Sequence, residues 1–185
     1  MTPFRTDFAV RSLLAGDIVA CATESVWGLS CDPWQETTVE SLLTLKNRHR
    51  KKGLILVAAD ISQFSFLLDD LSSTHKAQLE LSWPGATTWL VPHHQRVPEW
   101  ISGEHDTVAL RVSNHAAVKQ LCSAWGGPLV STSANTSGAQ SGTEIHQVKR
   151  YFGHELIYIM PGITGGRKWP SRIVDLATGK VLRPD

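Results

Sequence analysis

Short, largely apolar runs alternate with segments of helical spacing along most of this chain. Runs of the kind found in buried strands occur at residues 18–22, 54–59, 87–91, 108–112, 129–132, 156–160, 173–176 and 181–183. Helical spacing with suitable start or stop residues predicts helices over residues 6–15, 73–81, 114–125 and 144–152. Alternating strands and helices are typical of the α/β class. Because several connections are too short to contain a helix, we expect a mixed sheet.

A further helix is expected to begin at residue 37. The tetrapeptide at residues 37–40, Thr-Thr-Val-Glu, matches a capping box, and three leucines follow within residues 42–45. Before it, Thr23 and Glu24 open a loop that we expect to extend to about residue 33. The first apolar run would therefore deliver polar groups at its end.

Two polar clusters stand beside apolar segments. Six of the seven residues at positions 46–52 are cationic or, for His49, potentially cationic, and residues 131–138 read Ser-Thr-Ser-Ala-Asn-Thr-Ser-Gly. Crowded cations repel one another, so a polyanion would relieve them, and small polar side chains near a glycine let a ligand approach the backbone. Together the clusters predict a phosphate or nucleotide pocket. On charge density alone, residues 46–52 are explained equally well as a solvated face, with Lys46 and Arg48 favoured at a helix C-terminus.

The bulk composition limits the possibilities. A chain of 185 residues that is 42% hydrophobic fits one domain over residues 1–185. With 19% charged residues and a formal net charge of +1, it lacks the basic balance of a nucleic-acid coat, so any affinity for polyanions must be local. Cys21, Cys31 and Cys122 form no CxxC pair, which argues against a disulfide framework or structural zinc. Without a signal-peptide core or a membrane-length apolar span, a cytoplasmic protein with no membrane partner is expected.

Familiar nucleotide fingerprints are missing from the sequence. Neither GxxxxGK[ST] nor GxGxxG after a strand occurs, so an ATP site would use another cradle. Residues 162–167 are rich in glycine and end in Arg167. They form either a loop that closes over a ligand or an ordinary mobile turn.

Several motifs, taken in order, resemble the YrdC-domain family. They are Ala-Thr-Glu-Ser-Val-Trp-Gly-Leu at residues 22–29, Lys-x-Arg at 46–48, Lys-Gly-Leu-Ile-Leu at 52–56, Trp-Pro-Gly at 83–85, Val-Ala-Leu-Arg-Val at 108–112 and Ser-Thr-Ser-Ala-Asn-x-Ser-Gly at 131–138. The pairing of Lys-x-Arg with Ser-x-Asn is the most specific of them. The resemblance extends from about residue 18 to residue 183. It implies a twisted, largely mixed sheet flanked by helices, with a basic concave cavity.

The resemblance also implies an activity, that of an L-threonylcarbamoyladenylate synthase. Such an enzyme makes threonylcarbamoyl-AMP and pyrophosphate from L-threonine, bicarbonate or CO2 and ATP, with Mg2+. A downstream threonylcarbamoyl-transfer machinery would then use the product to modify the adenosine beside the anticodon, giving t6A, in tRNAs that read codons beginning with A. Two alternatives stay open, a double-stranded RNA-binding factor of ribosome maturation and an accessory carbamoyl-transfer domain within a larger protein.

The matching motif positions imply roles for individual residues. Threonine would contact Thr23, Arg111, Ser131 and Ser171. ATP would contact Arg48, Lys52, Thr107, Ser133, Asn135, Ser141 and Arg183, and catalysis would rest on Lys46, Arg48, Ser133 and Asn135. No metal ligand is assigned to the protein. The chemistry suits these residue types, because a carbamate oxygen must attack the α-phosphorus of ATP and cations must screen the two anions. Arg111 would hold the threonine carboxylate in fork geometry.

This sequence departs from the family pattern at a few positions. Cys21-Ala22 stands where Tyr-Pro is usual, Ser30 where Gly is usual, His49 where Pro follows Lys-x-Arg, and Trp169 where Asn precedes Pro-Ser. Alanine at position 22 frees a backbone that proline would fix, and His49 changes the turn that carries Arg48. We expect these changes to bear on catalytic rate more than on the fold.

Overall fold

The computed structural model describes residues 3–153, 155 and 157–184. Its strands are β1 (Ile18–Ala22), β2 (Trp27–Ser30), β3 (Ile55–Ala58), β4 (Thr87–Pro92), β5 (Thr107–Val112), β6 (Leu129–Ser133), β7 (Ile157–Ile159), β8 (Arg172–Asp175) and β9 (Val181–Arg183). They form one sheet in the order β7-β1-β2-β6-β3-β5-β4-β8-β9. The pairs β1–β7, β3–β5 and β4–β8 are parallel and the others antiparallel, which confirms the expected mixed sheet.

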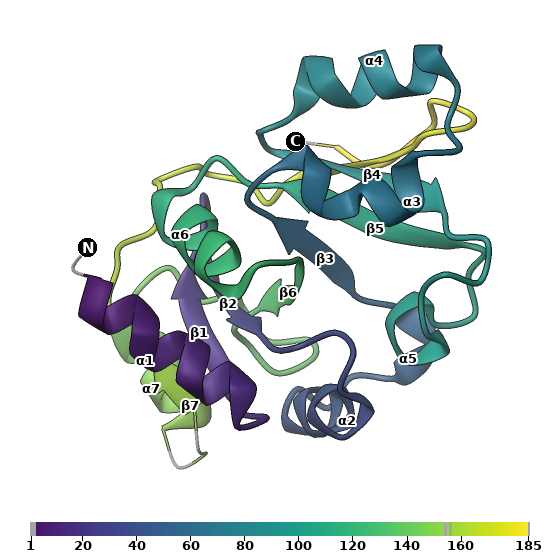
Figure 1. Ribbon diagram of the computed structural model, residues 1–185. Helices are drawn as coiled ribbons and strands as arrows, with labels where there is room; N and C mark the ends of the chain where they lie inside the picture. The colour runs from purple at the N-terminus through teal and green to yellow at the C-terminus, as the bar shows by residue number, and fades with distance from the viewer. Residues whose placement is uncertain (1–2, 154, 156, 185) are drawn as a thin grey trace.

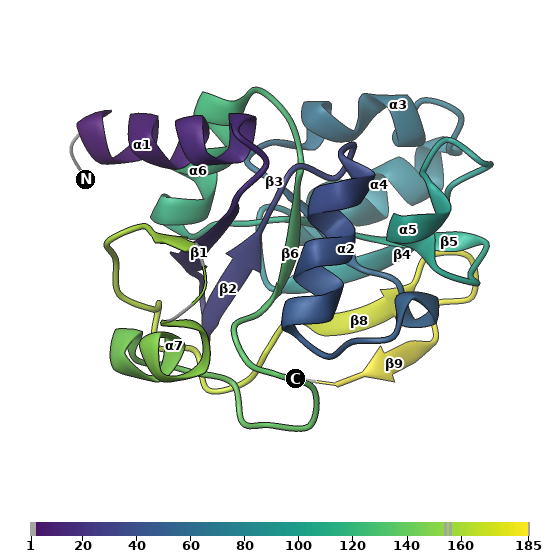
Figure 2. The same ribbon diagram turned by 90° about the horizontal axis from the view of Figure 1, so that it is seen from below.

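Helices cover both faces of this sheet. They are α1 (Pro3–Leu14), α2 (Glu36–Leu45), α3 (Ser65–Leu68), α4 (Ser73–Ser82), α5 (Glu99–Ser102), α6 (Ala116–Trp125) and α7 (Ile145–Phe152), with 3-10 turns η1 (Arg50–Lys52) and η2 (Ile61–Phe64). Helices α1 and α6 lie side by side over β1 (Figure 1), while α2 and α7 lie apart from them (Figure 2). None of the described helices has the length and apolar character needed to cross a membrane.

Strand β1 shows how one apolar run serves two cores. Val19 packs in a cluster with Leu13 of α1 and Leu121 of α6, whereas Ala20 belongs to a larger cluster that includes Leu56. Successive side chains of a strand point to opposite faces, so a continuous apolar run is what a strand covered on both sides requires.

Two expectations about residues 23–40 were wrong. The loop expected up to residue 33 contains β2, which pairs with β1 from Val19↔Ser30 to Ala22↔Trp27. Residues 23–26 are therefore a tight hairpin turn. The capping box at residues 37–40 is also absent, because the N-cap of α2 is Gln35, two residues before Thr37. The Thr38 hydroxyl instead donates to Gln35 Oε1 at 2.5 Å.

The other predicted elements are confirmed with shifts of one to three residues at their ends, the largest at the start of α1, which begins at Pro3 instead of Thr6. Leu156, expected to begin a strand, lies outside the described residues, and β7 begins at Ile157. Helices α3 and α5 were not predicted, since four residues each are too few to show a helical period.

Strand register places the candidate site. Ile55 of β3 pairs with Ser131 of β6 on one side and with Ala109 of β5 on the other, so these three residues form one row across the sheet. Ser133 lies two residues beyond Ser131, and Arg111 two residues beyond Ala109, in opposite directions from this row. Because a strand advances about 3.3 Å per residue, their rows are about 13 Å apart along the strands.

Candidate active site

A cavity of about 460 Å³ opens over this part of the sheet. Its floor includes the row of Ile55, Ser131 and Ala109. Ten of the twelve residues expected at the site line it, namely Thr23, Arg48, Lys52, Thr107, Arg111, Ser131, Ser133, Ser141, Ser171 and Arg183. Residues that are more than 100 positions apart in the chain therefore meet in one basic hollow, while Lys46 and Asn135 lie outside its lining.

The cavity has two ends, which we name by their register. The Ser133 end comprises Arg48, Lys52, Thr107 and Ser133. The register places Ser133 and Thr107 on the side of the Ile55 row where β3 begins, and Arg48 and Lys52 belong to the segment that leads into β3. The Arg111 end comprises Arg111, Ser171 and Arg183. The pairings of β4 with β5 and β8, and of β8 with β9, place Arg183 in the same row as Arg111. The predicted contact of Arg183 with ATP would thus be made from the end where threonine is expected.

The basic segment at residues 46–52 is divided between two roles. Arg50 forms ion pairs with Glu40 at 2.8 Å and with Glu36 at 3.4 Å, and Lys51 pairs with Glu104 at 2.5 Å. These cations are part of a solvated surface, as one of the two interpretations of the sequence held. Only Arg48 and Lys52 of this segment line the cavity.

Arg48 and Lys52 form no ion pair with a carboxylate within the described residues. The Arg48 guanidinium donates through one terminal nitrogen to the Gly53 carbonyl at 2.8 Å, while its buried Nε has no hydrogen-bond partner in that part of the chain. Burial lowers the pKa of Arg48. A guanidinium that is partly desolvated and lacks a counterion gains much from an anionic ligand.

Lys46 links the two polar clusters. Its buried ammonium donates to the carbonyls of Ser133 and Asn135, the latter at 2.6 Å, and its own carbonyl accepts from the Ser137 amide at 2.8 Å. Burial, followed by the charge of Arg48, lowers the pKa of Lys46 to about 8. The geometry therefore makes Lys46 a tie between the end of α2 and the hydroxyl segment. Its expected part in catalysis stays a prediction.

The side chain of Asn135 closes the loop that follows β6. Its Nδ2 donates to the carbonyls of Thr136 and Ala139 at 2.9 and 2.8 Å, and its Oδ1 accepts from the Ser141 hydroxyl at 3.2 Å. These bonds hold Ser141 where it reaches the cavity. A direct contact of Asn135 with ATP stays a prediction.

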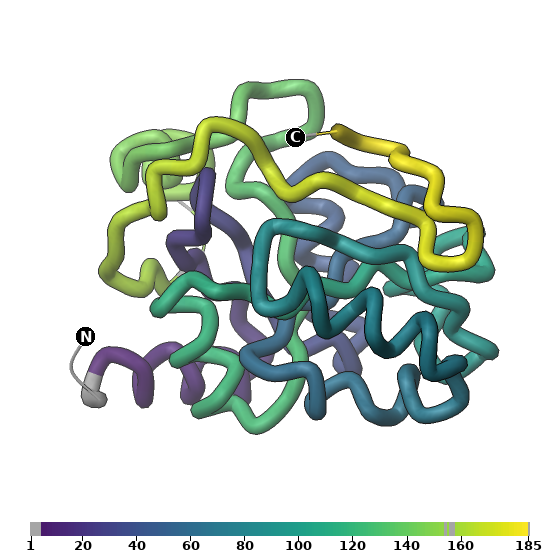
Figure 3. Tube along the Cα trace, turned by 90° about the horizontal axis from the view of Figure 1, so that it is seen from above, coloured from purple at the N-terminus to yellow at the C-terminus, as the bar shows by residue number. Residues whose placement is uncertain are grey.

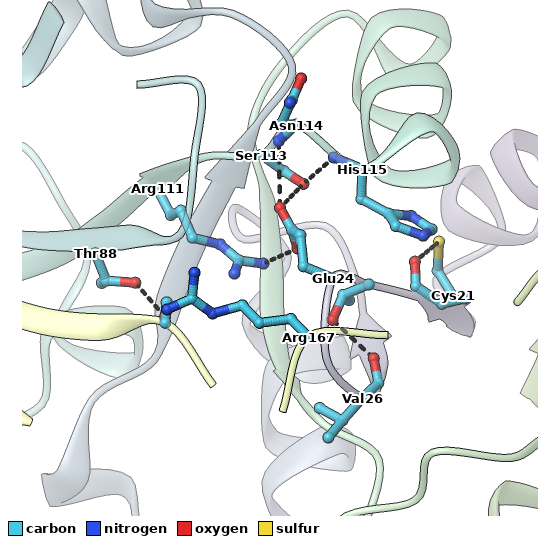
Figure 4. Close-up of polar contacts among 12 residues, drawn as sticks. Cys21, Glu24, Val26, Thr88, Arg111, Ser113, Asn114, His115 and Arg167 are labelled. Atoms are coloured by element: carbon cyan, nitrogen blue, oxygen red, sulfur yellow. Dashed lines mark hydrogen bonds and ion pairs between the residues drawn. The ribbon is translucent and has the colours of Figure 1, made fainter. Parts of the chain in front are cut away.

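Glu24 is a residue of the site that sequence reasoning missed. Its Oε2 lies 3.2 Å from a terminal nitrogen of Arg111, and its Oε1 accepts from the Ser113 hydroxyl and the Asn114 amide at 2.7 and 3.2 Å (Figure 4). Burial lowers the pKa of Arg111, and Glu24 opposes this shift. Its position directly after Thr23 was the only indication in the sequence that Glu24 lies near the site. Its partner Arg111 is 87 residues further along the chain.

Arg183 is held by Ser171. Its Nε and one terminal nitrogen donate to the Ser171 carbonyl at 2.9 and 2.6 Å, and the Ser171 hydroxyl lies 2.8 Å from that of Thr88. Thr88 and Arg111 directly follow the last β4–β5 pair, Trp89↔Leu110, so the register places them opposite each other. Ser171, expected to contact threonine, is therefore fixed between two strands at the Arg111 end.

Residues 160–171, which connect β7 to β8, run across the molecule (Figure 3), and Pro170 and Ser171 at their end line the cavity. The amides of Gly165 and Arg167 donate to the carbonyls of Thr23 and Glu24, each at 2.9 Å, and the Ile163 carbonyl lies 3.1 Å from His115 Nε2. The glycine-rich stretch is thus bonded to the β1–β2 turn. Its closure over a ligand stays a prediction.

The departures from the family pattern are accommodated locally. Ala22 is paired with Trp27 inside the β1–β2 hairpin, and the Thr23 amide and hydroxyl both donate to the Val26 carbonyl, at 3.0 and 2.7 Å. The hairpin therefore orients Thr23 without a proline. His49 caps η1 by accepting from the Lys51 amide at 3.2 Å.

The residues at the cavity do not fit a protein-bound metal ion. The lining includes cations, hydroxyls and His105 but no carboxylate, and the described part of the chain holds no group of three His, Cys, Asp or Glu that could bind a metal. An Mg2+ ion prefers oxygen ligands. Here it would have to come with the phosphates of a nucleotide.

Comparison with known proteins identifies the family. Residues 11–184 match the family named Sua5, YciO and YrdC, which is described as telomere recombination. This chain belongs to that family. A threonylcarbamoyl-AMP synthase from Pseudomonas fluorescens is 50% identical over 184 residues, which cover 100% of this chain and 99% of the relative.

Solved structures of the Sua5/YciO/YrdC family share the fold. P. abyssi Sua5 in complex with L-threonine has a TM-score of 0.90 and 29% identity, and a double mutant of the same protein has a TM-score of 0.93 and 28% identity. Both comparisons cover 100% of this chain, but only 55% and 57% of the Sua5 chains. This family member thus corresponds to slightly more than half the length of Sua5.

Proposed function

We propose that this protein is a threonylcarbamoyl-AMP synthase that forms threonylcarbamoyl-AMP and pyrophosphate from L-threonine, bicarbonate or CO2 and ATP. One observation carries the proposal. A single cavity combines Arg48, Lys52 and Ser133 at one end with Arg111 at the other. The name of the Pseudomonas relative and the threonine bound to P. abyssi Sua5 support the same activity.

The Ser133 end suits the triphosphate. Arg48 and Lys52 supply positive charge without competing carboxylates, and Ser133 adds a hydroxyl that can donate to a phosphate oxygen. Lys46 holds the backbone that carries Ser133. Preorganised cations of this kind stabilise the charge that develops as pyrophosphate leaves.

The Arg111 end suits the amino acid. Arg111 lines the cavity, with Thr23, Ser131 and Ser171 as further polar lining residues, and its guanidinium can donate two hydrogen bonds to a carboxylate in fork geometry. The separation of about 13 Å between the two rows leaves space for the carbamate and the α-phosphate between them.

The reaction needs positioning more than side-chain chemistry. Bicarbonate and the threonine amine form a carbamate with loss of water, and a carbamate oxygen then bonds to the α-phosphorus as the bond to pyrophosphate breaks. Neither step requires a covalent enzyme intermediate. Holding the two reactants in line can supply up to about 7 to 11 kcal/mol of the barrier reduction.

Further parts of the proposal follow from this chemistry. Mg2+ would enter with ATP and be bound by its phosphates. Residues 1–185 would act as one domain, which the single sheet supports. The product, a reactive mixed anhydride, would pass in the cytoplasm to a threonylcarbamoyl-transfer machinery that modifies tRNA to t6A. The relatives reported above favour this synthase over an RNA-binding factor of ribosome maturation.

The test is the substrate dependence of turnover. Purified protein with ATP and Mg2+ should release pyrophosphate only when both threonine and bicarbonate are present, and mass spectrometry should detect threonylcarbamoyl-AMP. Leaving out each substrate in turn is the control. Pyrophosphate release that continues unchanged without threonine would refute the proposed function.

A further inference from the structure

Glu24 forms polar contacts through both its backbone and its side chain, although it does not line the cavity. Its backbone carbonyl accepts from the Arg167 amide at 2.9 Å. In the side chain, Oε1 accepts from Ser113 and Asn114, while the buried Oε2 makes no hydrogen bond within the described residues and lies 3.2 Å from Arg111. One oxygen is thus anchored to the segment after β5, and the other faces the guanidinium (Figure 4).

Arg111 is crowded by like charges. Its side chain is only 9% exposed, and the charges of Arg167 and Arg183 act on the same region. Among the described residues, Glu24 is the one carboxylate in an ion pair with Arg111. A buried guanidinium that is repelled by two other cations needs a fixed counterion to stay in one orientation.

We propose that Glu24 is a positioning residue for threonine, and that its carboxylate, through the buried Oε2, holds the Arg111 guanidinium in the orientation that receives the threonine carboxylate. This inference rests on the proposed function and adds to it a residue behind the binding surface. Glu24 acts through Arg111, since Oε2 is shielded from the cavity by burial.

A simpler electrostatic view predicts the opposite result. The negative charge of Glu24 competes with the threonine carboxylate for Arg111, so its removal would tighten threonine binding if Arg111 stayed in place. We expect Arg111 to move instead, for two reasons. Arg167 and Arg183 repel it, and the glutamine NH2 group at the position of Oε2 would be a hydrogen-bond donor facing the N–H donors of Arg111.

The decisive variant is Glu24→Gln, which keeps the size of the side chain and an oxygen acceptor for Ser113 and Asn114. We expect KM for threonine to rise about tenfold or more, with KM for ATP within about twofold and kcat at saturating threonine within about threefold. Asp70→Asn, which removes the carboxylate of an exposed pair with Arg96, is the matched control and should leave all three constants within about twofold.

A double-mutant cycle separates positioning from a general structural role. In an Arg111→Gln background, adding Glu24→Gln should not weaken threonine binding further, because the residue through which Glu24 acts is gone. Equal and additive losses in both backgrounds would contradict the proposal.

Ser113→Ala keeps the test open if Glu24→Gln fails to fold. It removes the 2.7 Å bond to Oε1 but leaves the charge, and should raise KM for threonine about two- to fivefold. Unchanged or tighter threonine binding in the folded Glu24 variant, or in Ser113→Ala if that is the only one to fold, would overturn the inference. Threonine-dependent turnover of the wild type is measured alongside, and its absence would refute the proposed function instead.

Discussion

At the Ser133 end of the cavity, Arg48 and Lys52 have no carboxylate partner in the described chain, whereas at the Arg111 end the cation is paired with the buried Oε2 atom of Glu24. The first arrangement leaves positive charge available to a highly charged ligand. In the second, part of the positive charge is neutralised by the carboxylate that holds the guanidinium in one geometry. Under the proposed function, we expect charge to contribute most to binding the triphosphate at the Ser133 end, and a fixed orientation to contribute most to binding the threonine carboxylate at the Arg111 end.

The largest effect is expected from a substitution that removes a cation from the Ser133 end. Arg48→Ala should raise the dissociation constant for ATP about a hundredfold, because it removes a partly desolvated guanidinium from the triphosphate, and should leave threonine affinity within about threefold. Calorimetric titration measures both. The matched control is Arg50→Ala, two residues away and paired with Glu40 and Glu36, which should change ATP affinity by less than about twofold. A loss of similar size in the control would show that the net charge of the segment, and not the cavity, binds ATP.

A smaller effect is expected from Lys46, which bonds to the backbone that carries Ser133. Lys46→Met removes the bonds to the Ser133 and Asn135 carbonyls without removing any residue that lines the cavity. We expect kcat to fall roughly tenfold and ATP affinity to fall several-fold, with the fold retained, since a buried ammonium is exchanged for an apolar chain of similar size. Steady-state kinetics and thermal unfolding are the measurements. Full activity in a folded variant would contradict a positioning role for Lys46.

The Arg111 end makes a prediction about pH and stability. Burial opposes the ionisation of Glu24, but Arg111, the Ser113 hydroxyl and backbone amides together lower its pKa below 4.5. The carboxylate therefore stabilises the folded state above pH 4.5, and this contribution is lost as the pH falls below that value through the folded-state pKa. The difference in unfolding free energy between wild type and Glu24→Gln should shrink over that range in denaturant titrations. A difference that stays constant with pH would show that the pair contributes no charge-dependent stability.

The smallest effect is expected at the edge of the Ser133 end. Ser141→Ala removes one hydrogen bond to Asn135 Oδ1, while two other bonds still hold that side chain. We expect the dissociation constant for ATP to rise about two- to threefold. Loss of more than about tenfold would indicate that the Ser141 hydroxyl contacts the nucleotide directly.

The strands were largely predictable because β1 and β3 carry continuous apolar runs, of which all of β1 and three of the four residues of β3 are buried. Strand β2 was not, since Gly28 and Ser30 weaken the apolar pattern and the strand is recognised only by its pairing with β1 and β6. Local periodicity contains no information about such partners.

The candidate site was likewise predictable only in part. The resemblance to a family indicated Arg48, Arg111 and Ser133, and the structure brings them to one cavity. The sequence did not indicate which cations of residues 46–52 are neutralised, because Arg50 and Lys51 meet carboxylates from α2 and from the segment after α5. Glu24 was missed for the same reason, as its role depends on a distant partner.

Titration of each ligand into each of two variants tests the central claim, that one cavity binds ATP and threonine at different ends. Arg48→Ala should lose ATP affinity and keep threonine affinity, and Arg111→Ala should do the reverse, with wild-type protein as the reference in calorimetry. If either variant lost both ligands to the same extent while remaining folded, or if neither lost any affinity, the two-ended cavity would be contradicted.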